Sequence, residues 1–212
     1  MQAQGRISVL AKLQLLLMCL YFRILSMNDF FLLNNESLQH TFIDQKIEVK
    51  QIKVKDLNHF AQFADSIKKL DSYSIETITA LVETEIFNIM GLCSLVTSLD
   101  PENFAKHIAD QDAIAELVLK IIQVNEAFFK KEKQQSKSKT EVNESTWFDS
   151  FQYLISCGHR PDDILTMPYG AFMKYIEAAQ KNERQKIKNT ALAVRVAMHS
   201  SKQEWEKSMK QL

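Results

Sequence analysis

The stretch Gln123–Lys139, QVNEAFFKKEKQQSKSK, decides how the chain is organised, because an amphipathic helix ends within it. Apolar residues upstream recur at helical spacing and lead to two adjacent phenylalanines, Phe128 and Phe129. Beyond them lysine, glutamine and serine dominate, and no apolar residue appears until Val142. Such a composition cannot bury enough apolar surface to fold by itself. We therefore expect a polar linker over residues 132–145 between two folded modules.

The first module is expected over residues 27–131 and begins with a β-hairpin. Two β-prone runs, residues 41–43 and 47–54, are separated by three polar residues, which predicts two antiparallel strands. The alternation of apolar and polar residues changes phase near Gln51, so we expect a bulge or the end of the second strand there.

Helices are expected to complete the first module. Residues 55–70 carry a one-sided apolar stripe, and residues 74–99 carry the broadest apolar face of the chain, which predicts a central core helix. Asp100 followed by Pro101 is typical of a helix start, and Asp110 can cap the next helix.

A polar residue, Asn125, interrupts the apolar stripe of that last helix. A buried amide must find hydrogen-bond partners, so a bond to neighbouring backbone is its structural interpretation. Phe128 continues the stripe on the side of Ile121, whereas the adjacent Phe129 points about 100° away on a helix. We therefore expect Phe128 in the core and Phe129 at its edge, free to contact a partner.

The second module is expected over residues 146–212 and contains three helices. The first begins with Trp147 and ends at Gly158, a residue typical of helix C-termini. Pro161 followed by two acids starts a short helix, and Thr166 precedes a third, long one. The predicted fold class is therefore mainly α with a small β-hairpin, arranged as two small helical modules.

The composition excludes several classes of protein. Basic and acidic residues number 26 each, so no net charge attracts the chain to nucleic acid or to an anionic membrane. Only 4 glycines and 3 prolines occur, which favours long helices over turn-rich β folds. The cysteines Cys19, Cys93 and Cys157 lack metal-ligand spacing, and we interpret them as small packing residues of a reduced protein.

Residues 1–26 pose a separate question, because they resemble a signal sequence or an anchor. The run Leu13–Phe22 is apolar apart from Gln14, but a bilayer span needs about 20 apolar residues. Met27 opens the part that carries folding signals. We interpret residues 1–26 as an N-terminal extension from an over-extended start or as a peripheral helix, and a signal or anchor is the alternative.

No sequence signature indicates catalysis. The five histidines are scattered, and the motifs of nucleotide loops, hydrolase elbows and paired-cysteine metal sites do not occur. We therefore predict no catalytic residue, no cofactor and no metal, and a protein that is not an enzyme. His159 is interpreted as a turn residue, since no nucleophile is placed near it. The cationic band Lys181–Arg195 is interpreted as a solvated helix face.

Both halves nevertheless carry strings that resemble one protein family. The first half ends in Val118–Lys131, VLKIIQVNEAFFKK, and the second contains Leu154–Leu165, LISCGHRPDDIL. Together they resemble the tail assembly chaperones of long-tailed bacteriophages and prophages, in which a longer product gains a second domain by a programmed frameshift. The matching positions are Val124, Asn125, Phe128, Phe129, Trp147, Gly158, His159, Pro161, Ile164, Leu165, Tyr169, Tyr175, Ala178, Ala179 and Arg184.

The resemblance implies a function in virion morphogenesis. A chaperone of this family would bind the tape-measure protein, recruit tail-tube subunits in the cytoplasm of the bacterial host, and be absent from the mature virion. The small second module also favours self-association. Nucleic acid and membrane are not expected partners, although a DNA-binding regulator using Lys181–Arg195 and a membrane-associated protein using Leu13–Phe22 are the alternatives. The residues expected to bind partners are Asn125, Phe128, Phe129, Trp147, Phe151, His159, Tyr169 and Tyr175.

Overall fold

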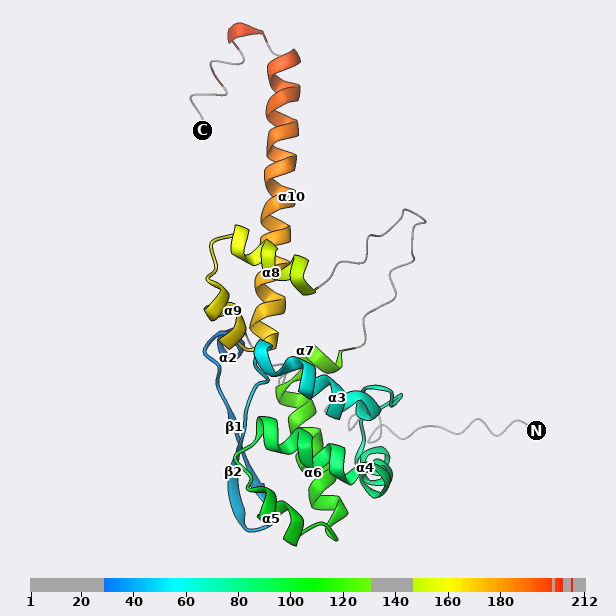
Figure 1. Cartoon of the computed structure of the whole chain (residues 1–212). Coiled ribbons are helices and arrows are strands. Elements are labelled where there is room, and N and C mark those ends of the chain that lie inside the picture. The colour runs from blue at the N-terminus through cyan, green and yellow to red at the C-terminus, as the bar shows by residue number, and fades with distance from the viewer. Residues whose placement is uncertain (1–28, 131–146, 200, 204–206, 208–212) are drawn as a thin grey trace, which may run out of the picture. The chain divides into compact units, whose positions relative to one another are not determined.

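The computed structural model describes residues 29–130, 147–199, 201–203 and 207. Over these residues the chain is mostly helical and contains a two-stranded antiparallel sheet, as Figure 1 shows. The predicted fold class, mainly α with a small hairpin, is confirmed. The expected N-terminal extension 1–26 and the expected linker 132–145 lie outside the described residues.

The chain divides into two compact units. Of the described residues, the first unit contains 29–130 together with Met167–Gly170, and the second contains 147–166 together with those from Ala171 onward. The sequence-based division places everything after residue 146 in the second module, and the structure differs from it at Met167–Gly170. These residues belong to the first unit because their backbone pairs with that unit at Lys53.

The hairpin consists of β1 (Leu38–Phe42) and β2 (Gln45–Val49), which pair antiparallel. Ile43 and Asp44 form the turn, and Ile43 has a φ of 55°, which is unusual for a β-branched residue. Its side chain packs against the hydrophobic core, and that contact compensates for the backbone conformation. The second strand ends at Val49, which agrees with the strand end expected near Gln51.

The outer edge of β2 is closed by the chain that follows the helix α4 (Ile75–Val96). The Lys50 N–H donates to the Val96 carbonyl at 2.6 Å, and the Ser98 N–H donates to the Glu48 carbonyl at 3.0 Å. An edge strand with unpaired backbone groups is prone to pairing with other chains, so these bonds protect the hairpin.

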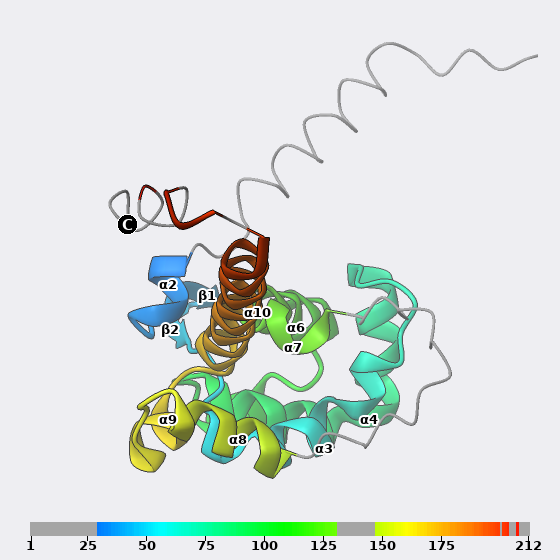
Figure 2. The same cartoon turned by 90° about the horizontal axis from the view of Figure 1, so that it is seen from above.

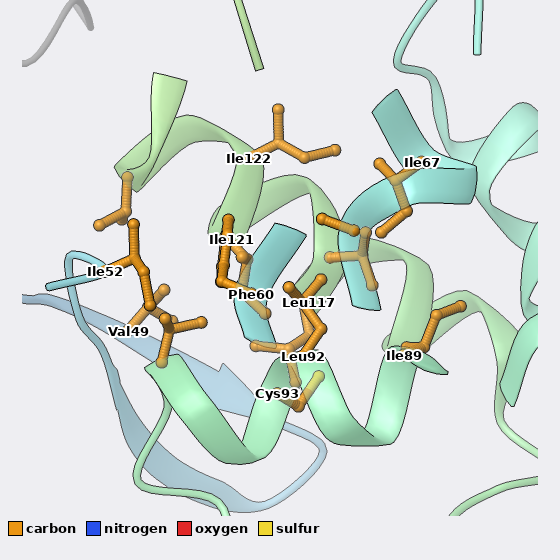
Figure 3. Close-up of a cluster of buried hydrophobic side chains, with 14 of the residues drawn as sticks. Val49, Ile52, Phe60, Ile67, Ile89, Leu92, Cys93, Leu117, Ile121 and Ile122 are labelled. Carbon is orange, nitrogen blue, oxygen red and sulfur yellow. The ribbon is translucent and has the colours of Figure 1, made fainter. Parts of the chain in front are cut away.

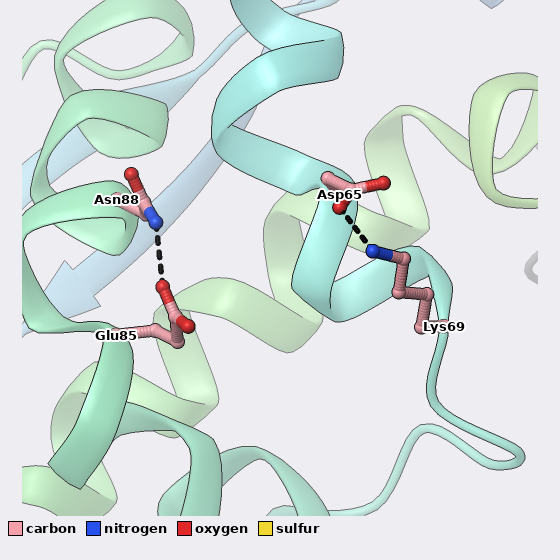
Figure 4. Close-up of polar contacts among 4 residues, drawn as sticks. All are labelled: Asp65, Lys69, Glu85 and Asn88. Atoms are coloured by element: carbon pink, nitrogen blue, oxygen red, sulfur yellow. Dashed lines mark hydrogen bonds and ion pairs between the residues drawn. The ribbon is translucent and has the colours of Figure 1, made fainter.

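Short helices flank the hairpin, α2 (Asp29–Leu33) before it and η1 (Val54–Asp56) after it. The chain then enters α3 (Leu57–Lys68), whose apolar stripe is buried as its helical spacing predicts. The helix ends beside an exposed ion pair between Asp65 and Lys69, drawn in Figure 4.

The long helix α4 begins with a capping box. The Thr77 N–H donates to the Ser74 hydroxyl, and the Ser74 N–H donates to the Thr77 hydroxyl. The helix kinks at Glu85, whose φ of −121° is not helical. The Thr84 hydroxyl donates to the Leu81 carbonyl one residue before this kink, and bonds from threonine side chains to helix carbonyls are known to bend helices. Figure 4 shows the Asn88 amide donating to the Glu85 carboxylate across the kink.

Among the described helices, α4 is the one long and apolar enough to cross a membrane by length and composition. Six of its side chains lie in the core of the first unit.

Three further helices complete the first unit, α5 (Pro101–Lys106), α6 (Gln111–Val124) and α7 (Glu126–Phe129). The Asp100 carboxylate accepts from the Glu102 N–H at 3.0 Å, and the Asp110 carboxylate accepts from the Ala113 N–H at 3.2 Å. Both predicted helix starts are therefore confirmed. The break between α6 and α7 is not predicted by the apolar spacing.

The core of the first unit lies where α3, α4, α6 and the second strand meet. Figure 3 shows side chains from these elements converging on one another. Each fully buried leucine, isoleucine or phenylalanine there stabilises the fold by about 1.5–3 kcal/mol. The labelled members are Val49, Ile52, Phe60, Ile67, Ile89, Leu92, Cys93, Leu117, Ile121 and Ile122.

The second unit contains α8 (Trp147–Ser156), α9 (Pro161–Thr166) and most of α10 (Tyr169–His199). In Figures 1 and 2, α8 and α9 lie beside the N-terminal part of α10. Leu154, Ile164 and Phe172 are the large buried side chains that these helices contribute.

The end of α8 is a Schellman motif centred on Gly158. The His159 N–H donates to the Leu154 carbonyl at 3.1 Å, and the Gly158 N–H donates to the Ile155 carbonyl at 2.9 Å. Gly158 has a φ of 98°, a conformation that only glycine adopts without strain. The predicted helix end is therefore confirmed.

The two described cysteines should differ in reactivity. Burial raises the pKa of the Cys93 thiol to about 12. Cys157 is exposed, so the interpretation of Cys157 as a packing residue is wrong.

A maleimide added to the native chain should label Cys157 and spare Cys93, because the thiolate is the nucleophile. Peptide mass mapping measures this, and labelling in denaturant, where both should react, is the control. Equal labelling of both in the native chain would contradict the packing of α4.

Candidate partner-binding surfaces

Asn125 lies at the end of α6 and is almost fully buried. Its side-chain oxygen accepts from the Ile52 N–H at 2.7 Å. Its side-chain nitrogen donates to the Lys50 carbonyl at 3.2 Å and to the Ile121 carbonyl at 3.1 Å. The expectation that this buried amide bonds to neighbouring backbone is confirmed. The amide joins a helix end to a chain segment more than 70 residues earlier in the sequence.

Both phenylalanines of the opening stretch are buried, with exposed fractions of 8% for Phe128 and 2% for Phe129. The prediction that Phe129 lies at the edge of the core is wrong. Asn125 has a φ of −108° and a ψ of 32°, so the helix breaks there and α7 starts in a new direction. The spacing of 100° per residue measured from α6 therefore does not apply to Phe129.

The two phenylalanines belong to an aromatic cluster of the first unit. The Phe128 and Phe129 rings lie 5.2 Å apart between centroids, and Phe60 contacts both of them edge-on. The Tyr73 ring contacts Phe129, and its hydroxyl donates to the Phe129 carbonyl at 3.3 Å. Burial raises the pKa of Tyr73, which keeps this hydroxyl protonated as a donor.

Tyr169, expected at a partner-binding surface, joins the same cluster. Its ring lies 6.1 Å from that of Phe128 between centroids, and it packs partly buried against the core. Together with Asn125, Phe128 and Phe129 it forms part of the interior of the first unit. The structure therefore places half of the expected partner-binding residues where they stabilise the fold.

The other four expected residues, Trp147, Phe151, His159 and Tyr175, lie in the second unit. The Trp147 and Phe151 rings both contact Phe172, with centroid distances of 6.0 and 5.7 Å. His159 stacks edge-on against Tyr175 at 4.7 Å. Trp147 is 53% exposed and Tyr175 is 37% exposed, so these aromatic side chains retain surface that a partner can contact.

The C-terminal part of α10 exposes a surface that the sequence analysis only partly anticipates. Ile187, Ala191, Val194 and Met198 follow one another at intervals of four, three and four residues, and we call them the apolar stripe. At 100° per residue they point within about 60° of one another. Ile187, Val194 and Met198 are 63%, 52% and 75% exposed.

A row of cations runs beside this stripe. Lys181, Arg184, Lys188 and Arg195 recur at intervals of three, four and seven residues, so they share one flank of the helix. Every residue from 180 to 195 is exposed. The nearby acid Glu183 accepts a hydrogen bond from the Tyr153 hydroxyl at 3.0 Å, and local desolvation and this bond raise the pKa of Tyr153.

Over residues 29–130 and 147–199 we find no cluster of three or more side chains suited to hold a metal ion. One open depression lies at the start of α6, where Ala109, Asp110, Gln111 and Asp112 line it. Comparisons of the chain with protein-family models, with curated proteins and with solved structures found no match.

The burial of the phenylalanine pair predicts that both residues stabilise the fold. Phe128→Ala and Phe129→Ala should each lower the free energy of unfolding by about 3–5 kcal/mol, measured by chemical denaturation. Phe87→Ala is the matched control, because Phe87 is 79% exposed on α4 and its loss should cost less than about 0.5 kcal/mol. If Phe129→Ala left the free energy of unfolding unchanged, Phe129 would have to lie at the edge of the core.

Removal of the Asn125 amide should also destabilise the first unit. Asn125→Ala leaves the buried Ile52 N–H without its partner and removes the bond to the Lys50 carbonyl, and an unsatisfied buried group costs about 1–3 kcal/mol. Thermal unfolding measures the loss. Asn189→Ala on the exposed part of α10 is the control and should be nearly neutral, because the higher helix propensity of alanine offsets the lost bond from Gln185. A melting temperature equal to that of the wild type would contradict the structural role of Asn125.

Proposed function

We propose that the chain is a tail assembly chaperone of long-tailed bacteriophages, which binds the tape-measure protein and recruits tail-tube subunits while the tail is built. The proposal combines the resemblance of Val118–Lys131 and Leu154–Leu165 to that family with the surface of α10. It places the protein in the cytoplasm of the bacterial host and outside the finished virion.

The observation that carries the proposal is the exposed apolar stripe of α10. Soluble proteins seldom leave large apolar side chains in a continuous row without a function. A row at helical spacing is the pattern by which amphipathic helices recognise one another. The exposed rings of Trp147 and Phe148 in α8, which are 53% and 68% exposed, add aromatic anchors of the kind enriched in binding sites.

The cationic row adds a requirement on the partner. A helix that packs on the stripe would lie beside Lys181, Arg184, Lys188 and Arg195. Like charges brought together at an interface oppose binding, whereas opposite charges favour encounter and register. We therefore expect the tape-measure segments that bind to be apolar on one face and acidic on the flank of that face.

Aspartate substitutions in the stripe test the proposal. Ile187→Asp combined with Val194→Asp should weaken binding of a co-expressed tape-measure fragment at least about tenfold, because both replace apolar anchors by charges. The melting temperature should stay near that of the wild type, since both side chains are more than half exposed.

The matched control is Asn182→Asp combined with Asn189→Asp, which adds the same two charges seven residues apart on the opposite side of α10 and should leave binding unchanged. The fragment is taken from the long, helix-rich reading frame expected next to this gene. Retention of the fragment by the double variant at wild-type strength would refute the stripe as the binding surface. Loss of binding by the control variant would show a non-specific effect of charge.

A DNA-binding regulator is the second candidate, and the alignment of four cations on one flank of α10 favours it. Neutralising phosphates releases counterions, so DNA affinity would fall steeply with salt, whereas packing of apolar helices would not. Lys188→Gln combined with Arg195→Gln would then weaken DNA binding and reduce the steepness of its dependence on salt.

A further inference from the structure

The extended chain from Glu48 to Val54 has an outer edge that several parts of the first unit close in turn. The segment after α4 pairs with its beginning, and the Asn125 amide bonds to Lys50 and Ile52. The last portion is closed by Met167–Gly170. The Tyr169 N–H donates to the Ile52 carbonyl at 2.8 Å, and the Val54 N–H donates to the Met167 carbonyl at 3.1 Å.

The segment Met167–Gly170 matches the hydrogen-bonding pattern of this edge. Pro168 lies opposite Lys53 in an antiparallel bridge, and the two hydrogen bonds come from the residues on either side of it. At such a position the N–H of residue 168 would point away from the partner strand, so the missing N–H of proline costs no bond. Pro168 is buried in this contact.

The side chains that follow Pro168 fit complementary neighbours. The Tyr169 ring packs edge-on against Phe128. Gly170 approaches Leu32 so closely that a Cβ on it would lie 2.7 Å from the Leu32 Cδ2 atom. A larger residue at position 170 would force the Leu32 side chain to move, so the pair Tyr169–Gly170 fits its neighbours as they lie.

We propose that the edge Ile52–Val54, with Phe128 and Leu32 beside it, is an acceptor site for an extended Met-Pro-Tyr-Gly segment, and that a second copy of the chain can supply this segment. Every copy carries both the acceptor and the segment that fits it. Within one chain the site is occupied by the chain's own Met167–Gly170, since covalent linkage gives that segment a high effective concentration. Exchange between two copies produces a dimer by the addition of a strand to an edge. This proposal does not depend on tape-measure binding.

Two variants of the full chain separate the acceptor from the segment. Gly170→Val keeps the acceptor and weakens the fit of the segment, because the new side chain enters the space that the Leu32 Cδ2 atom occupies. Val54→Pro keeps the segment and removes the N–H that donates to Met167. Proline is tolerated there because Val54 is the first residue of η1, and Lys53, with a φ of −85° and a ψ of 149°, has the conformation that precedes proline.

Complementation between these variants tests the proposal. Each variant alone should be monomeric, and an equimolar mixture should contain a complex of one copy of each, measured by light scattering after gel filtration. A chain that carries both substitutions, mixed with the Val54→Pro chain, is the control and should form no complex, because neither copy then holds an intact acceptor. The synthetic peptide LTMPYGAFM, residues 165–173, should bind the Gly170→Val chain at least about tenfold more tightly than the wild type, whose site is occupied.

Circular dichroism and the melting temperature establish that both variants are folded. Tyr169→Ala, which removes the ring contact with Phe128, replaces Gly170→Val if the latter does not fold. A mixture of folded variants that stays monomeric and a peptide that fails to bind would overturn the proposal. Dimers formed by the Gly170→Val chain alone would also overturn it, because the segment of that chain fits the site poorly.

Discussion

The side-chain amide of Asn125 is the interaction on which the first unit depends. It accepts from the Ile52 N–H and donates to the carbonyls of Lys50 and Ile121, so one buried group holds the end of α6 against the chain leaving the hairpin. A buried amide with these bonds unmade would be costly, which fixes the relative position of the two segments. The same residue ends α6, and this break turns α7 so that both Phe128 and Phe129 enter the core.

The backbone of Ile52 connects Asn125 to a third part of the chain, the segment Met167–Gly170. Its N–H is held by Asn125, and its carbonyl accepts from the Tyr169 N–H. The Tyr169 ring then contacts Phe128, whose position depends on the same break in the helix. The acceptor edge, the aromatic cluster and the returning segment Met167–Gly170 are therefore coupled, and disturbance of one should weaken the others.

The second unit buries fewer of its large side chains than the first, and local interactions support its long helix α10. Among residues 147–199, few large side chains of this unit are buried, and from residue 180 to residue 195 every residue of α10 is exposed. A helix of this kind gains little stability from tertiary packing, so its length is supported by residues with good helix propensity and by local pairs such as Gln185 with Asn189. An apolar stripe held away from the core in this way is available for a partner, which agrees with the proposed function in tail assembly.

The sequence by itself determined the features that depend on residues within one or two turns. The mainly helical class, the hairpin, the starts of α5 and α6 at Asp100 and Asp110, and the end of α8 at Gly158 all follow from local propensity and capping. The expected surface aromatics of the second unit, Trp147 and Tyr175, also retain exposed area. Only the tertiary structure decided the break at Asn125, the burial of Phe129 and the return of Met167–Gly170 to the first unit. Each of these depends on hydrogen bonds or ring contacts with residues far away in the chain, and no local pattern specifies which distant group will be the partner.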